Sequence, residues 1–131
     1  MGILLFPLLL SAQSDAIKIP HCIGQYFRLN RGGPELVGVD IFVHPEFGHT
    51  IKVNIKGRRN RSAQDLAYAF TSAAAVANLA GHVEVLWVEM DINFKDIETT
   101  QALADVDCSI DALILGDCNT KKFWENCVRF P

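Results

Sequence analysis

Residues 62–94 read SAQDLAYAFTSAAAVANLAGHVEVLWVEMDINF and carry the strongest structural signal of the chain. Ser62 is a good helix N-cap, and Asp65 three residues later completes a capping-box pattern with Asp in place of the usual Glu. Apolar residues then recur with helical spacing at Leu66, Ala69, Phe70, Ala73, Val76, Ala77 and Ala80. Gly81 follows as a natural helix end. The stretch therefore predicts a helix over residues 62–80.

From Val83 onward the apolar period changes from 3.6 to 2, which predicts a half-buried strand. Its apolar side consists of Leu86, Val88, Met90, Ile92 and Phe94. Glu89 and Asp91 fall together on the other side, where two carboxylates invite acid–base or metal chemistry. Alternating carboxylates are also the usual composition of a solvated strand face, and we favour that interpretation.

The second face of the predicted helix carries no charged residue between Leu66 and Gly81. Solvated helix faces are normally rich in Lys and Glu. This face is therefore either weakly polar and exposed or covered by a second copy of the chain. Its residues are Tyr68, Thr71, Ser72, Ala75 and Asn78. The second interpretation predicts self-association.

The flanking segments predict further strands. Residues 22–29 are rich in β-formers and predict a first strand, while residues 35–44 predict a second with Val37, Val39, Ile41 and Val43 on one face. Residues 49–56 predict a third strand that forms a hairpin with the second. Residues 95–107 suit a short helix or a returning strand, and their β-branched content favours the strand. Short helices are predicted over residues 110–115 and 121–127.

The order β-β-β-α-β, with a possible fifth strand and short C-terminal helices, predicts the α+β class. We expect a single domain over residues 15–131, in which a small curved antiparallel sheet packs on one long helix. The same order occurs in OB-folds, which include binders of oligonucleotides and oligosaccharides. That likeness is one of element order alone and carries little functional weight.

The N-terminal residues 1–14 predict a signal peptide. An apolar run over residues 3–10 precedes small residues at Ala12 and Ser14, which indicates a cut between Ser14 and Asp15. The run is too short to be a transmembrane segment. Because it lacks a preceding Lys or Arg, a structural N-terminal strand is the alternative.

The cysteines indicate the compartment. An even number after a signal-like start predicts two disulfides in a secreted or periplasmic protein. We expect the pairs Cys118–Cys127, which bracket a short segment, and Cys22–Cys108. Free thiols in a cytosolic protein are the alternative.

The candidate site is the basic loop, which we define as residues 56–61. Its four cations, Lys56, Arg58, Arg59 and Arg61, directly precede a helix N-terminus in a chain of net charge −3. Arginine suits carboxylate, phosphate or sulfate, so the loop predicts an anion or glycan contact. A merely solvated loop is the alternative. The negative net charge argues against nucleic acid as a partner.

No nucleophile-elbow, zinc-protease or phosphate-loop motif occurs, and no metal or cofactor is expected. The leading hypothesis is a small secreted or periplasmic non-enzymatic binding module that self-associates. One alternative is a small hydrolase-like enzyme that uses a histidine and a carboxylate, for which His44 and His49 flank a turn containing Glu46. A second alternative is an OB-like nucleic-acid binder.

Overall fold

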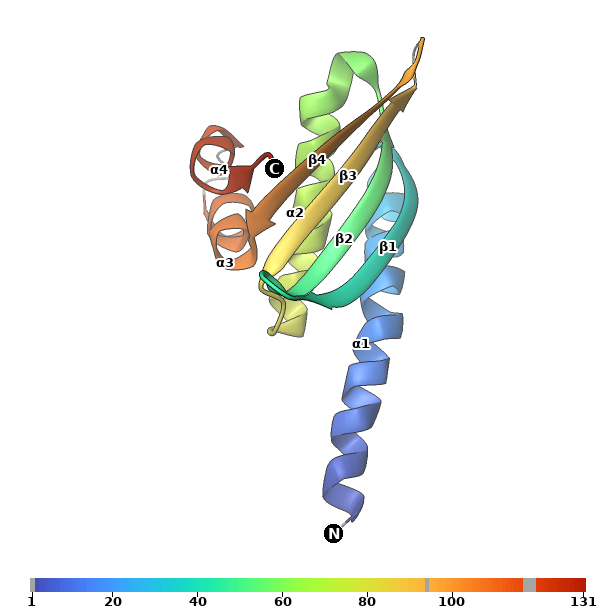
Figure 1. Ribbon diagram of the computed structural model, residues 1–131, viewed down its shortest axis with the longest axis vertical. Coiled ribbons are helices and arrows are strands. Elements are labelled where there is room, and N and C mark those ends of the chain that lie inside the picture. The colour runs from blue at the N-terminus through green and yellow to red at the C-terminus, as the bar shows by residue number, and fades with distance from the viewer. Residues whose placement is uncertain (1, 94, 117–119) are drawn as a thin grey trace.

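The computed structural model describes residues 2–93, 95–116 and 120–131, with side chains from residue 16 onward. Its elements follow one another in an α-β-β-α-β-β order, after which come short helices and a last short strand (Figure 1). They are α1 (Gly2–Leu29), β1 (Glu35–His44), β2 (Gly48–Gly57), the 3₁₀ turn η1 (Arg59–Arg61), α2 (Ser62–Ala80), β3 (Val85–Asn93), β4 (Ile97–Asp105), α3 (Val106–Ser109), the π-helical turn η2 (Ile110–Leu115), α4 (Thr120–Asn126) and β5 (Val128–Arg129).

The five strands form one open sheet in the order β1-β2-β3-β4-β5. β1 with β2, and β3 with β4, are antiparallel hairpins, whereas β2 and β3 are parallel. The crossover through α2 returns the chain to the start of β2, so β3 runs in the same direction beside it. The α+β class is thus confirmed, with the difference that the sheet is mixed and does not close into an OB-like barrel.

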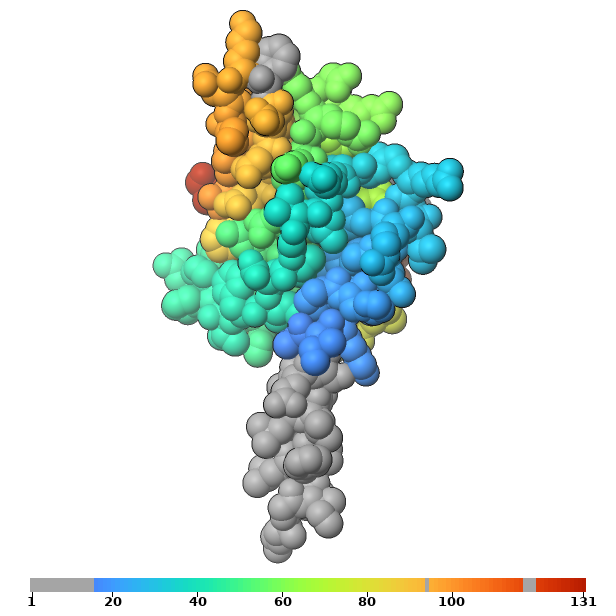
Figure 2. All heavy atoms as spheres, turned by 90° about the vertical axis from the view of Figure 1, so that its right-hand side faces the viewer, coloured from blue at the N-terminus to red at the C-terminus, as the bar shows by residue number. Residues whose placement is uncertain are grey.

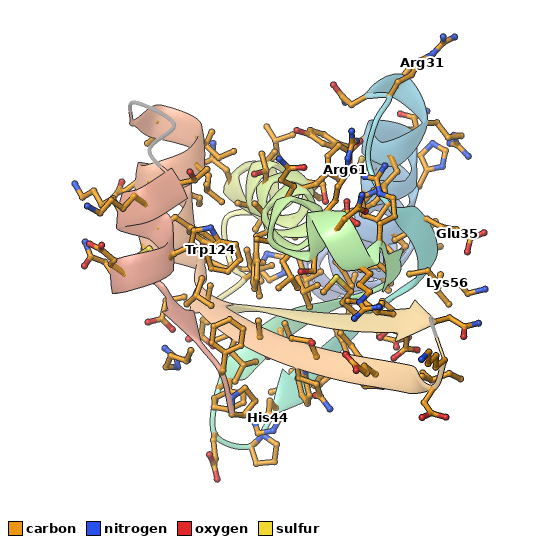
Figure 3. The ribbon with its side chains drawn as sticks, turned by 90° about the horizontal axis from the view of Figure 1, so that it is seen from above. Arg31, Glu35, His44, Lys56, Arg61 and Trp124 are labelled. Carbon is orange, nitrogen blue, oxygen red and sulfur yellow. A yellow bond between two sulfur atoms is a disulfide. The ribbon has the colours of Figure 1, made fainter. Side chains whose placement is uncertain are left out.

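All the helices lie on one side of the sheet, and His44 lies on the other (Figure 3). We call these sides the covered face and the open face. The predicted helix is confirmed over residues 62–80, with Gly81 in the left-handed conformation as its C-cap. The predicted strand is confirmed as β3, whose Leu86, Val88 and Met90 are buried on the covered face. Phe94 lies outside the described residues.

The core is built where the alanine-rich face of α2 meets the sheet. Small side chains let the helix lie close, so one large residue, Phe70, fills the remaining space and is fully buried. Its ring lies 5.3 Å from that of Phe123 of α4. The C-terminal helices, which the sequence predicted, therefore complete the same core.

The predicted first strand over residues 22–29 is wrong, because this segment is the C-terminal part of α1. Ile19, Ile23 and Phe27 recur at helical spacing, and the first two are buried. Packing on α2 decides their conformation more strongly than their β-propensity. Figure 2 shows this part of α1 against the β1 side of the molecule.

At Tyr68, the charge-free face of α2 contacts α1 of the same chain. The ring of Tyr68 lies 4.9 Å from Phe27 and 5.6 Å from Tyr26, and its hydroxyl donates to the carbonyl of Asn30 at 2.6 Å. Burial raises the pKa of this phenol, with a smaller contribution from Tyr26. Asn78, farther along the same face, is exposed, so self-association stays a prediction.

A β-bulge changes the predicted facing of β1. The register shifts between Leu36 and Gly38, so Leu36 pairs with Ile55 while Val37 is 60% exposed. The extra residue turns Val37 away from the core. Val43 is also exposed, at the end of the strand.

The disulfide joins Cys108 to Cys127, which corrects both predicted pairs. α3 follows β4, and β5 returns to pair with the end of β4, which brings the two Cα atoms to 5.6 Å. Sequence spacing alone does not determine such connectivity. Cys22 is an exposed free thiol on α1, and Cys118 lies outside the described residues.

Within the part of the chain that the structure describes, none of the helices has the length and apolarity needed to cross a membrane. The cut between Ser14 and Asp15 stays a prediction. Among residues 16–29 of α1, whose side chains the structure describes, Ile19 and Ile23 are buried.

Candidate functional site

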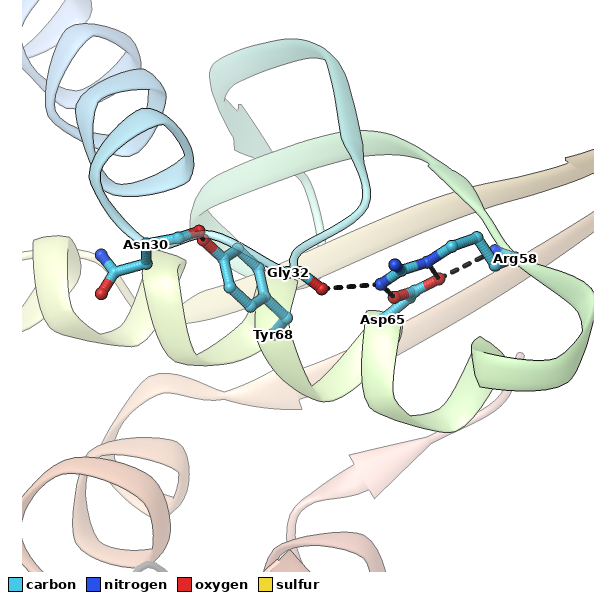
Figure 4. Close-up of polar contacts among 5 residues, drawn as sticks. All are labelled: Asn30, Gly32, Arg58, Asp65 and Tyr68. Carbon is cyan, nitrogen blue, oxygen red and sulfur yellow. Dashed lines mark hydrogen bonds and ion pairs between the residues drawn. The ribbon is translucent and has the colours of Figure 1, made fainter.

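The basic loop separates its four cations. Arg58 is held by Asp65, whose side chain is only 1% exposed (Figure 4). The guanidinium donates to both carboxylate oxygens, at 2.6 Å from Nη2 and 3.2 Å from Nε, and the backbone N–H of Arg58 donates at 2.8 Å. Nη2 also donates to the carbonyl of Gly32 at 2.7 Å. The hydrogen bond to Asp65 raises the pKa of Arg58. This cation therefore ties the loop to α2 and to the turn between α1 and β1.

The same contacts correct the predicted capping box. The N-cap position of α2 is Arg61, which makes no side-chain cap hydrogen bond, and Ser62 is the first helical residue. Asp65 is turned toward Arg58 instead. Its carboxylate neutralises part of the positive field at the helix N-terminus.

The remaining cations of the loop do not converge. Lys56 lies 3.5 Å from Glu35, with both side chains 67% exposed, and Figure 3 shows this pair apart from Arg61. Arg59 and Arg61 are exposed. The loop thus presents separate charges and no shared cradle.

The histidine pair of the hydrolase alternative is not formed. His44 pairs with Gly48 in the hairpin, while His49 pairs with Val43. His44 Nδ1 accepts the backbone N–H groups of Glu46 at 3.0 Å and Phe47 at 3.3 Å. The ring of His49 instead lies 5.5 Å from that of His82. Each histidine therefore has a different environment.

The two carboxylates of β3 on the open face, Glu89 and Asp91, contact different partners. Glu89 lies 3.7 Å from Lys52. Asp91 accepts a hydrogen bond from the hydroxyl of Thr99 at 2.7 Å. Among the described residues, no group of three or more potential ligands is placed to hold a metal ion.

A polar hollow of about 650 Å³ lies beside the start of β3. Two of its three acidic side chains already serve the fold, since Glu84 accepts the N–H of His49 at 2.9 Å and Asp105 lies 3.2 Å from Arg129, and the third, Asp107, is exposed. We therefore regard it as a structural feature.

The open face carries a site that our sequence reasoning missed. Four aromatic rings form a cluster there: those of Phe42 and Trp87 lie 6.2 Å apart, and His44 stacks on Phe47 at 4.2 Å. Lys52 places Nζ 4.7 Å from the centre of the Trp87 ring. The detectable signal was a pair of large aromatics, Phe42 and Trp87, at strand positions where a solvated face is usually polar.

Beside this cluster lies the Trp87 hollow, a depression of about 430 Å³ over β3 and β4. Its lining consists of Phe47, Trp87, Thr99, Gln101, Leu103 and Pro131. Trp87 Nε1 donates to Gln101 Oε1 at 2.9 Å, which fixes the amide so that its NH₂ group is left for another partner. The hollow thus combines aromatic walls with uncharged hydrogen-bonding groups.

Comparison of the chain with models of protein families, with curated proteins and with solved structures finds no match. The function must therefore be inferred from the site itself.

Proposed function

We propose that this protein is a non-enzymatic binding module that holds a neutral, hydroxyl-rich ligand, a glycan, in the Trp87 hollow. The observation that carries the proposal is the lining of this hollow, which offers the Trp87 ring, a fixed Gln101 amide and a Thr99 hydroxyl. Its size lies within the range of about 300–1,000 Å³ that is typical of small-ligand sites.

The charges around the hollow favour a neutral ligand over an anion. None of its lining side chains is charged. The nearest cation on the same face, Lys52, is already engaged by Glu89 and by the Trp87 ring. A phosphate backbone would find no cation in the lining, so the nucleic-acid alternative has little support here.

The chemistry of the lining also favours binding over catalysis. None of the six lining side chains is a carboxylate, imidazole, serine hydroxyl or thiol, and the one hydroxyl, that of Thr99, already donates to Asp91 at 2.7 Å. General acid–base or nucleophilic catalysis needs such a group within hydrogen-bonding reach of the reacting atoms.

We further propose that the module acts in an oxidising compartment outside the cytoplasm. The Cys108–Cys127 disulfide supports this location, because disulfides persist mainly in such compartments. N-terminal sequencing of the protein from its natural host tests it, with Asp15 as the expected first residue. A first residue at Met1 would contradict the predicted cut.

The glycan proposal is tested by screening neutral and sulfated oligosaccharides and then measuring affinities by calorimetry. We expect neutral sugars to bind and Gln101→Ala to weaken the binding by about tenfold or more, the effect of one lost hydrogen bond. The matched control is Asn54→Ala, an uncharged residue of the same face that does not line the hollow. In the Trp124→Phe background, Trp87 is the single tryptophan, so its fluorescence should change on binding.

Two outcomes would count against the proposal. The first is that no neutral sugar binds. The second is that only sulfated sugars bind and that Arg59→Ala/Arg61→Ala, but not Gln101→Ala, removes the binding. The second outcome would indicate that the glycan binds at the basic loop and not in the Trp87 hollow.

A further inference from the structure

We propose that Asn60 is the acceptor of an N-linked glycan when the chain passes through a secretory pathway that supplies a lipid-linked oligosaccharide. This inference rests on the location outside the cytoplasm that we propose above. Asn60, Arg61 and Ser62 form the acceptor pattern, in which a Ser or Thr follows two residues after the Asn and the residue between them is not Pro. The pattern is absent at the other asparagines, which are Asn30, Asn54, Asn78, Asn93, Asn119 and Asn126. It therefore selects one position in the chain.

The structure places this pattern at the surface, where β2 leads into α2. All three residues of η1, Arg59–Arg61, are exposed, and Ser62 is the first residue of α2. The N-cap position of this helix makes no side-chain cap hydrogen bond. Because uncapped helix ends open at low cost in free energy, the Ser62 hydroxyl becomes accessible without unfolding of the core. A transferase can therefore recognise the pattern in the new chain and after folding.

The geometry of the turn directs an attached glycan away from the packed side chains. A groove of about 490 Å³ lies beside Trp124, and both Arg59 and Ser62 contribute to its lining. Side chains three residues apart lie on the same side of a 3₁₀ turn. Asn60 is one residue further along the turn, is exposed and is not part of that lining. Its amide therefore faces solvent, where a bulky sugar displaces no core residue.

The modification is a group transfer without a change in oxidation state. Nδ2 of Asn60 forms a bond to C1 of the first sugar, while the bond from C1 to the pyrophosphate of the lipid carrier breaks. The lipid pyrophosphate leaves with the electron pair of that bond, and Nδ2 loses one proton to a base of the transferase. The chain itself contributes only the amide and the Ser62 hydroxyl.

A glycan on Asn60 leaves the Trp87 hollow open. The lining of the hollow comes from the β1–β2 turn, β3, β4 and the last residue of the chain. Figure 3 shows Arg61, the neighbour of Asn60, on the helix side of the sheet and away from His44. Asn60 also lies between Arg59 and Arg61, so the glycan would cover these exposed cations and restrict the access of large anionic partners to the basic loop.

The test expresses the full chain in a eukaryotic secretory cell, once as it stands and once with an established signal peptide ahead of Met1. Intact mass is measured before and after treatment with peptide-N-glycosidase, which removes the glycan and converts the acceptor Asn to Asp. We expect a loss of mass on treatment and conversion at position 60.

Four variants identify the acceptor. Asn60→Gln and Ser62→Ala should lose the glycan, whereas Ser62→Thr should keep it, because Thr also provides the required hydroxyl. Asn78→Gln is the matched control, at an exposed asparagine of α2 that lacks the pattern, and should keep the glycan. Because Asn60 is exposed, its variant should still fold and form the Cys108–Cys127 disulfide.

Three outcomes separate this proposal from the proposed location. Secreted protein that carries no glycan in either form would overturn the proposal and leave the location intact. A glycan that persists in Asn60→Gln would also overturn it. A glycan that forms only behind the added signal peptide would support Asn60 as the acceptor and would contradict the location alone.

Discussion

The two faces of the sheet use similar residues for different purposes. On the covered face, Phe70 is fully buried and Asp65 holds Arg58 at 2.6 Å. On the open face, Phe42 is half-buried and Glu89 lies 3.7 Å from Lys52. Aromatic rings and ion pairs thus occur on both sides. The difference is in desolvation. The contacts on the covered face are shielded from water and stabilise the fold, whereas those on the open face are partly solvated and available to a ligand.

The largest expected effect comes from the two phenylalanines. Phe70→Ala should lower the free energy of unfolding by about 3–5 kcal/mol, because it leaves a cavity between α2 and α4. Phe42→Ala should cost about 1 kcal/mol or less, since water can fill the vacated space. Denaturant titration measures both values. Equal losses of unfolding free energy in the two variants would contradict the distinction between the faces. They would mean that Phe42 is as well packed in solution as Phe70.

A smaller effect should separate the two carboxylates. Asp65→Asn should cost about 2 kcal/mol, because a buried acceptor of several charge-assisted hydrogen bonds becomes a neutral amide. Glu89→Gln should change stability by less than about 1 kcal/mol, as expected for a solvated pair. Thermal unfolding at neutral pH compares the two variants directly. A larger loss for Glu89→Gln would show that the open-face pair also supports the fold.

Most of the architecture could be predicted from local patterns in the sequence. The helix over residues 62–80 and strand β3 have strong, unmixed periods, and Gly81 marks the change between them. The α+β class followed from the order of these elements. Helix α1 was missed, because Ile23, Tyr26 and Phe27 are good β-formers and only the packing against α2 shows that their spacing is helical.

The candidate site was harder to predict because it depends on which residues meet in three dimensions. Counting charge located the basic loop but did not show that buried Asp65 engages Arg58. The Trp87 hollow joins the β1–β2 turn, two strands and the last residue of the chain. No local window of sequence contains that combination. The bulge at Val37 and the Cys108–Cys127 pair were missed for the same reason.

The smallest expected effect concerns the exposed cations of the basic loop, which stay a predicted anion contact. Arg59→Ala/Arg61→Ala should leave stability within about 0.5 kcal/mol of the native value, because both side chains are exposed. Exposed ion pairs are worth about 0.2–1 kcal/mol each and are screened by salt. Binding of a sulfated glycan at low salt should therefore weaken by no more than about tenfold, and the difference should vanish at high salt.

The matched control is Lys121→Ala/Lys122→Ala, which removes two exposed cations of α4 and changes the net charge equally. Equal weakening of glycan binding in both variants would show that net charge, and not the basic loop, causes the effect. If neither double variant changed the affinity for the sulfated glycan, the loop would be solvated surface and would have no role in binding.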